Sequence, residues 1–309
     1  MTRRLAFFLL SFSCAPAFAH TDGDLLSSSG SWTYDPWLII PLYFAAILFL
    51  VGTKVLWRRA GGGKGIRYWQ VACFWAGWLV LTLSLVSPLH WLAERMLTAH
   101  MIEHELIMAV AAPLLVMSRP TAAYLWAFPM PVRLWFGSIA HASPVSFLWA
   151  LLSLPLVATL LHAGTILVWH IPVFFDAALE NPLVHKLQHA SFLLTALLFW
   201  WVLLGMPRRL FALGALHLFL TMLALTVLGA LLALAPSPLY AAYASPPFGL
   251  TRIEDQQLAG IFMWVPGCSI YAAAAVAMFW LWLRSLEKQS RSSQADFYPH
   301  REIQPRPAR

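Results

Sequence analysis

Two pairs of histidines, each with a spacing of four residues, are the feature of this sequence best suited to chemistry. His100 and His104 form the first pair, and His185 and His189 form the second. Residues four apart lie on the same face of an α-helix, so each pair presents two imidazoles side by side. Two such pairs at one depth on two helices could share a single metal ion.

Two further histidines, His162 and His170, lie toward the end of another apolar segment, and we expect one of them to complete the ligand set. The predicted metal ligands are therefore His100, His104, His185, His189, His170 and His162. Histidines inside a membrane also serve as hydrogen-bonding groups between helices or as steps of a proton path. Both of these roles remain alternatives to a metal site.

Methionines and carboxylates flank the first histidine pair. Met96 and Met108 continue its helical stripe and are candidate soft ligands, with core packing as their alternative role. Glu103 and Glu105 fall on other faces of the same helix. We therefore expect these two carboxylates to orient or gate the ligands rather than to bind the ion first.

Two more groups of polar residues belong to the predicted site. Asp176 and Glu180 lie in a loop before the second histidine pair, where we expect them to orient its imidazoles through their second ring nitrogens. Asp255, Gln256 and Gln257 stand at the start of the last apolar segment. We expect them to cap that helix or to contact a partner protein.

Imidazole and thioether groups without a usable thiol favour copper, above all Cu(I), in an oxidising compartment. The three cysteines, Cys14, Cys73 and Cys268, stand alone and form neither a disulfide framework nor a thiolate site. Nearby carboxylates leave zinc and iron open. The alternatives from other classes are a membrane enzyme with a di-iron-type histidine cluster, a b-type haem protein and a proton-coupled permease. We expect a metal carrier and no enzyme.

The composition decides what kind of molecule must hold these residues. Of 309 residues, 60% are hydrophobic and 11% are charged, whereas soluble domains carry about 25% charged residues. A soluble enzyme is therefore excluded, and a helical membrane protein remains. The net charge of +7 comes largely from basic residues in short loops, where they set orientation in the lipid bilayer, so nucleic acid is excluded as a partner.

The fold class that we predict is all-α, a polytopic membrane bundle of seven helices after a cleavable signal peptide. The seven spans are Trp37 to Trp57, Tyr68 to Val86, Leu97 to Met117, Val145 to Trp169, Leu183 to Leu203, Ala212 to Leu234 and Leu258 to Leu283. Segment 120–144 holds four prolines, so we expect an amphipathic loop at the membrane interface there rather than an eighth span.

The predicted domain order is a signal peptide at residues 1–19, a periplasmic segment at 20–36, the membrane domain at 37–285 and a disordered cytoplasmic tail at 286–309. Basic residues fall mainly in the loops on one side of this arrangement: Arg58, Arg59, Lys64, Arg67, Arg119, Arg133, Arg208 and Arg209. This asymmetry places the mature N-terminus in the periplasm and the C-terminus in the cytoplasm of a bacterial inner membrane. All six predicted ligands then lie toward the periplasm.

Three motifs stand out in the apolar segments and the loops between them. The first is His100-Met101-Ile102-Glu103-His104-Glu105-Leu106 with Ala112-Pro113-Leu114-Leu115 and Arg119-Pro120. The second runs from Trp169-His170-Ile171-Pro172 through Phe175-Asp176-Ala177-Ala178-Leu179 to Val184-His185, Gln188-His189 and Phe199-Trp200-Trp201. The third is Glu254-Asp255-Gln256-Gln257-Leu258-Ala259-Gly260 with Met263-Trp264-Val265-Pro266-Gly267. Together they resemble the family of caa3-type cytochrome c oxidase assembly factors, usually called CtaG.

The resemblance covers roughly residues 35–285 and implies a polytopic membrane protein that helps to assemble haem-copper oxidase through copper supply. It implies oxidase subunits as partners, with periplasmic copper chaperones as a further expected class. One departure from the family pattern is Glu103, which stands where a glutamine is expected between the two histidines. A carboxylate at this position adds negative charge next to the predicted ligands.

Overall fold

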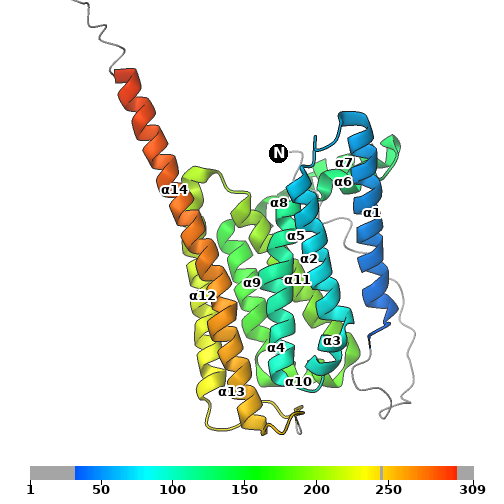
Figure 1. The fold of residues 1–309 in the computed structure, drawn as a ribbon, viewed down its shortest axis with the longest axis vertical. Coiled ribbons are helices and arrows are strands. Elements are labelled where there is room, and N and C mark those ends of the chain that lie inside the picture. Colours follow the sequence, from blue (N-terminus) through cyan, green and yellow to red (C-terminus); the bar gives the residue numbers. More distant parts are fainter. Residues whose placement is uncertain (1–31, 244–245, 298–309) are drawn as a thin grey trace, which may run out of the picture.

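Helices account for every regular element in the part of the chain that this computed structural model describes, which is residues 32–243 and 246–297. The predicted signal peptide at residues 1–19 lies outside these ranges. The long elements are α1 (Pro36–Ala60), α2 (Tyr68–Val86), α4 (Leu97–Glu105) with η1 (Leu106–Ala111) and α5 (Ala112–Ser118), α9 (Pro155–Trp169), α11 (Pro182–Leu204), η2 (Arg208–Leu210) with α12 (Phe211–Leu234), and α13 (Arg252–Phe262) with η3 (Met263–Gly267) and α14 (Cys268–Phe297). They run lengthwise beside one another (Figure 1).

Short helices close the two ends of the bundle. We call the end that carries α3 (Pro88–Ala93), α10 (Pro172–Glu180) and the start of α13 the histidine end (Figure 1). The opposite end carries α6 (Thr121–Trp126), α7 (Met130–His141) and α8 (Ser143–Leu152), and we call it the arginine end. At the arginine end, the guanidinium groups of Arg59 and Arg133 both lie against the ring of Trp126.

Six helical stretches in the described ranges are long and apolar enough to cross a membrane, so the chain is a multi-pass membrane protein. Two further pairs, α7 with α8 and α9 with α10, pass the same test only as bent units, with bends of 69° and 74°. Counting each bent pair as one span gives up to eight. The number seven therefore stays a prediction.

Proline breaks the region in which the sequence predicts one continuous span from Val145 to Trp169. That expectation is wrong: α8 ends at Leu152 and α9 begins at Pro155. Leu154 has an extended backbone, with ψ of 130°, because the ring of a following proline disfavours the helical conformation. Segment 120–144 is also more regular than the expected loop, since it forms α6 and α7.

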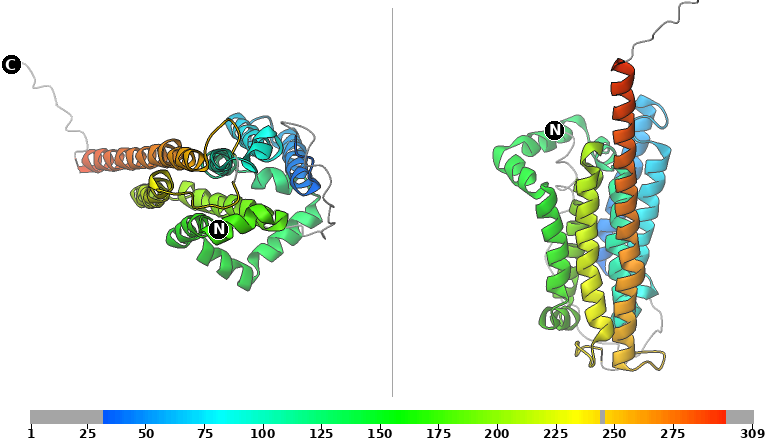
Figure 2. Two further views of the ribbon diagram at one scale, coloured as in Figure 1. Left: turned by 90° about the horizontal axis from the view of Figure 1, so that it is seen from below. Right: turned by 90° about the vertical axis from the view of Figure 1, so that its left-hand side faces the viewer.

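The last long helix continues beyond the residue at which the sequence places the end of the membrane domain. α14 runs to Phe297 and extends past the neighbouring helices at the arginine end (Figure 2). Residues 298–309 of the predicted tail lie outside the described ranges.

Two long helices change from α to π geometry part-way along. In η1 the wider turn precedes Pro113, and in η3 it contains Pro266. A proline inside a helix removes a donor and crowds the preceding turn, which a π turn accommodates. The indole of Trp200 on α11 donates a hydrogen bond of 2.9 Å to the Met108 carbonyl within η1. Both π segments lie next to Glu105, because η1 begins at the following residue and Gly267 of η3 packs against its carboxyl group.

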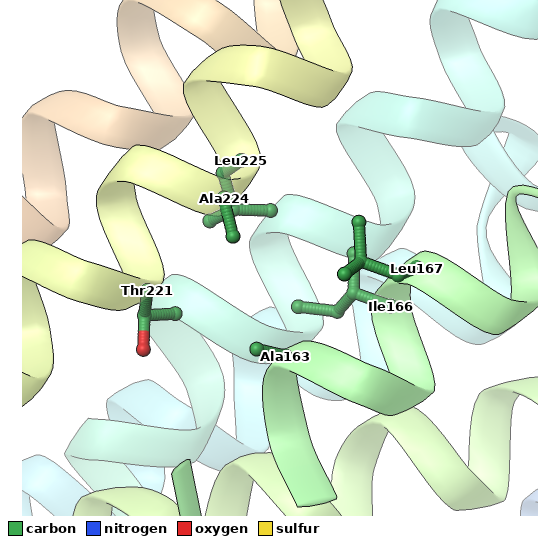
Figure 3. Close-up of a pocket in the computed structure, with 6 residues that line it drawn as sticks. All are labelled: Ala163, Ile166, Leu167, Thr221, Ala224 and Leu225. Atoms are coloured by element: carbon green, nitrogen blue, oxygen red, sulfur yellow. The ribbon is translucent and has the colours of Figure 1, made fainter. Parts of the chain in front are cut away.

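Apolar side chains cover the surface that would face lipid, with Leu160, Leu220 and Phe279 among the exposed ones. A shallow hollow lies on this surface between α9 and α12, lined largely by alanine and leucine side chains (Figure 3). Thr221 is its polar member, and its hydroxyl donates to the His217 carbonyl at 3.0 Å. The hollow thus offers no unpaired polar group to a ligand.

A glycine lets α1 approach α6 closely, which gives a test of the packing. A Cβ at Gly52 would overlap the carbonyl oxygen of Ala123, so Gly52→Ala should lower the free energy of unfolding by about 1–3 kcal/mol. Gly164→Ala on α9 is the control, because no heavy atom lies within 4 Å of its added Cβ. Thermal unfolding in detergent should show a lowered midpoint for the first variant alone. Equal unfolding midpoints for Gly52→Ala and Gly164→Ala would contradict the close packing of α1 against α6.

Candidate metal centre

Five imidazoles meet at the histidine end of the bundle. They belong to His90 on α3, His100 and His104 on α4, and His185 and His189 on α11. Ring centroids lie 4.2 Å apart within the α4 pair and 4.5 Å apart within the α11 pair. Across the two helices the distance is 5.1 Å from His104 to His189 and 5.6 Å from His100 to His185. The two pairs thus form one group, which we call the histidine cluster.

His90 joins the cluster from α3, a short helix that the sequence pattern did not predict. Its ring lies 5.6 Å from that of His185 and 5.8 Å from that of His189. Ser87 begins α3 by accepting a hydrogen bond from the Leu89 amide, and Pro88 follows at the first helical position. This Ser-Pro start was the available sequence signal, but the direction in which α3 turns depends on its packing against α2 and α4.

Glu103 lies inside the histidine cluster, whereas the sequence analysis expects it on a different face. A hydrogen bond of 2.8 Å joins its Oε1 to Nδ1 of His90, and its Oε2 lies 4.0 Å from Nε2 of His189. Its side chain is fully buried. One ligand atom from each of His90, Glu103 and His189 falls within 4.8 Å of the others, so these three could hold one ion. Glu103 follows His100 by three residues, so it lies next to the face of α4 that carries His100 and His104, on the side toward α3.

Several buried atoms of the cluster have no hydrogen-bond partner within the described part of the chain. They are Nδ1 and Nε2 of His104, Nε2 of His185, Nε2 of His189 and Oε2 of Glu103. Burial of polar groups without partners is costly, and native proteins rarely leave so many together. A bound cation would satisfy them, so the donor set fits a metal ion.

His90 is the member of the cluster that lies outside the long apolar helices, on α3. Burial lowers the pKa of His90. The hydrogen bond to Glu103 and the negative charges of Glu103, Glu94 and Asp35 raise it by more than burial lowers it, so the pKa lies above its ordinary value. The hydrogen bond to Glu103 thus favours the protonated form of His90.

The remaining two predicted ligands do not enter the cluster. His170 lies beside it, with Nδ1 on the Ile166 carbonyl at 2.7 Å and Nε2 at 3.4 Å from the sulfur of Met101. His162 lies outside the cluster. Its ring nitrogens contact the Tyr271 hydroxyl at 3.2 Å and the Thr195 hydroxyl at 3.3 Å. His162 therefore serves as a hydrogen-bonding group between helices.

Methionines are arranged differently from the expected stripe. Met96 packs with Ala93 and Ala99 at the start of α4, and Met108 packs in the main apolar core. The thioether that contacts a histidine is that of Met101. His170 and Met101 are 69 residues apart in the sequence, so no local spacing indicated this contact.

A connecting segment after α12 covers the cluster. Tyr243 donates to the Ala93 carbonyl at 2.8 Å, and Tyr240 donates to the His170 carbonyl at 3.1 Å. Asp176 holds this segment by accepting from the amides of Ala241 and Ala242 at 3.1 and 3.3 Å. Asp176 therefore orients the covering segment rather than the imidazoles. The second predicted orienting carboxylate, Glu180, is exposed at the end of α10.

Asp255 caps the helix that carries the first histidine pair. Its carboxylate accepts from the amides of Leu97 and Thr98 at 2.8 and 3.0 Å and from the Thr98 hydroxyl at 2.7 Å. The cap thus acts on α4, while α13 itself begins with a capping box formed by Thr251 and Glu254.

Gln256 and Gln257, which were predicted to act together with Asp255, differ in their burial and their contacts. The Gln256 side chain accepts from the Leu239 amide at 2.6 Å and donates to the Leu232 carbonyl at 3.3 Å, so it anchors the covering segment. Gln257 is half-buried on α13.

The sequence model of the family described as "cytochrome c oxidase caa3 assembly factor" matches residues 47–285. The chain belongs to this family. The match confirms the predicted resemblance, and it contains every residue of the histidine cluster. The described part of the chain also has several helices long and apolar enough to cross a membrane.

A curated relative is similar to part of the chain. It is the "Uncharacterized protein ML1998" of Mycobacterium leprae (strain TN), 25% identical over 190 residues. The alignment covers 58% of this chain but only 28% of that protein, so the chain matches less than a third of the relative's length. No solved structure matches the chain significantly.

Loss of the Asp255 cap should loosen α4. Asp255→Ala removes three buried hydrogen bonds and leaves amides unpaired, so the free energy of unfolding should fall by about 1–3 kcal/mol. Gln257→Ala, two residues further on, is the matched control and should unfold like the wild type. The measurement is the unfolding midpoint in detergent. An unchanged midpoint for Asp255→Ala would show that the cap does not hold α4 in place.

Proposed function

We propose that this assembly factor holds Cu(I) in the histidine cluster and transfers it to a subunit of haem-copper cytochrome c oxidase. One observation carries the proposal: imidazoles from three separate helices meet in one group, and several of their buried nitrogens lack hydrogen-bond partners in the described structure. Membership of an oxidase assembly family supports the choice of recipient.

The donor chemistry favours copper as the cargo. Imidazole nitrogen binds copper well, and the thioether of Met101 beside His170 adds a soft donor next to the cluster. The described cysteines, Cys73 and Cys268, are free thiols on α2 and α14, so neither belongs to the three helices that form the cluster. Zinc and iron are the competing ions, because the carboxylate of Glu103 also suits them.

A cluster with more imidazoles than one ion needs is suited to transfer rather than to permanent storage. An ion bound by some of the five rings can exchange one ligand for a neighbour, since adjacent centroids are 4.2–5.8 Å apart. The covering segment of Tyr240 and Tyr243 closes the outer side of the cluster. Its displacement would open the route by which copper arrives and leaves.

The orientation that we propose places the histidine end toward the periplasm of a bacterial plasma membrane. Arg59 and Arg133 lie at the opposite end, and loops rich in arginine remain in the cytoplasm. Periplasmic copper chaperones and oxidase subunits would then both reach the histidine end. We infer a role in binding and delivery without catalysis, in keeping with an assembly family.

Metal content of the purified protein tests the proposal. The double variants His100→Ala/His104→Ala and His185→Ala/His189→Ala each remove two imidazoles from the cluster, so Cu(I) affinity should fall by at least about 100-fold. The control is His162→Gln, whose side chain lies in the separate Tyr271 pair and should leave copper affinity unchanged. Elemental analysis and competition with a Cu(I) chelator provide the measurements.

Three outcomes would contradict this function. Unchanged copper affinity in both double variants would remove the histidine cluster as the site. A Soret band in the wild type would indicate a haem protein, and bound iron with oxygen-dependent product formation would indicate a di-iron enzyme.

A further inference from the structure

Glu105 is a buried carboxylate that the histidine cluster does not use. It follows His104, but its side chain faces the other side of α4, against Gly267 of η3. It forms no hydrogen bond or ion pair within the described part of the chain, and its Oε2 is fully buried. Eight residues after Leu97, it lies about 12 Å along the helix, near the middle of a hydrocarbon core about 30 Å thick. Ionisable residues at this depth are costly and mark functional sites.

A cavity of about 170 Å³ opens beside this carboxylate. We call it the Glu105 pocket. Its first wall comes from α4 and η1, and its second wall comes from the α13–η3–α14 helix. The wall residues are Ile102, Leu106 and Val110 on the first side and Phe262, Pro266 and Ile270 on the second. Phe262 is 39% exposed and the neighbouring Val265 is 58% exposed, so the pocket opens onto the apolar, lipid-facing surface.

Local helix geometry makes room for the carboxylate. A Cβ at position 267 would lie 2.7 Å from Cδ of Glu105, so only glycine allows the carboxyl group to rest against η3. The two π segments, η1 and η3, adjoin Glu105 from opposite walls. Such segments are frequent at functional sites, where they displace a helix from regular packing.

We propose that the Glu105 pocket receives a hydrogen-bond-donating side chain from a transmembrane helix of a partner protein. The unpaired carboxylate is complementary to an ammonium, amide or hydroxyl group, and the apolar walls are complementary to a helix surface. Phospholipid headgroups stay at the interface, about 12 Å or more from this depth, whereas a transmembrane helix can carry a donor into the hydrocarbon core. Under the proposed function, this partner would be an oxidase subunit. Only that choice of partner rests on the proposed function.

Synthetic transmembrane peptides provide a defined probe. We suggest polyleucine helices with a central lysine, asparagine or leucine, labelled for energy transfer to the full-length protein in copper-free vesicles. The lysine and asparagine peptides should bind the wild type about 5–30-fold more tightly than the leucine peptide. Glu105→Gln should keep the preference for asparagine and lose that for lysine, because an amide accepts hydrogen bonds but carries no charge. Glu105→Leu should lose both preferences.

Equal binding of the three peptides, or preferences that survive in Glu105→Leu, would overturn the proposal. A lipid-soluble small molecule found by native mass spectrometry on the wild type and absent from Glu105→Leu would overturn it in favour of a different occupant. Copper affinity should be the same in Glu105→Leu as in the wild type. Because the peptide assay contains no copper, a failure of copper binding in the histidine variants would leave this result unaffected.

Discussion

Buried polar groups in a membrane protein need partners from within the protein, because lipid offers none. The histidine cluster departs from this constraint: four buried imidazoles, the half-buried imidazole of His185 and a buried carboxylate lie together, and the hydrogen bond between His90 and Glu103 satisfies only part of them. Buried histidines elsewhere in the described structure are paired: His162 contacts Tyr271 and Thr195, and His170 contacts the Ile166 carbonyl. The contrast separates histidines that hold helices together from histidines that are free to bind an ion.

One helix positions both features that we interpret as functional. α4 begins under the cap of Asp255, presents His100 and His104 to α11 on one face, and presents Glu105 to η3 on another. It then passes into the π segment η1, where Trp200 of α11 bonds to the Met108 carbonyl. A shift of α4 would therefore change the histidine cluster and the Glu105 pocket together.

Periodicity predicted the parts of the site that depend on a single helix. The spacing of four residues correctly indicates that each histidine pair shares a face, and apolar length correctly indicates most of the long helices. Tertiary contacts decide the rest. Nothing local distinguishes His162 from the cluster ligands, since its partner Tyr271 is 109 residues away, and His90 depends on the turn at Ser87 and Pro88. The contact of Glu103 with His90 was not foreseen, because α3, which carries His90, was not predicted as a helix.

X-ray absorption spectroscopy of the Cu(I)-loaded protein tests the central claim most directly, because it identifies the atoms bound to copper. If imidazoles from α4 and α11 share the ion, the spectrum should show nitrogen donors with the outer-shell scattering of imidazole rings, and this signal should weaken in His100→Ala/His104→Ala and in His185→Ala/His189→Ala alike. A first shell without imidazole scattering, or a spectrum that neither pair of substitutions changes, would contradict the account.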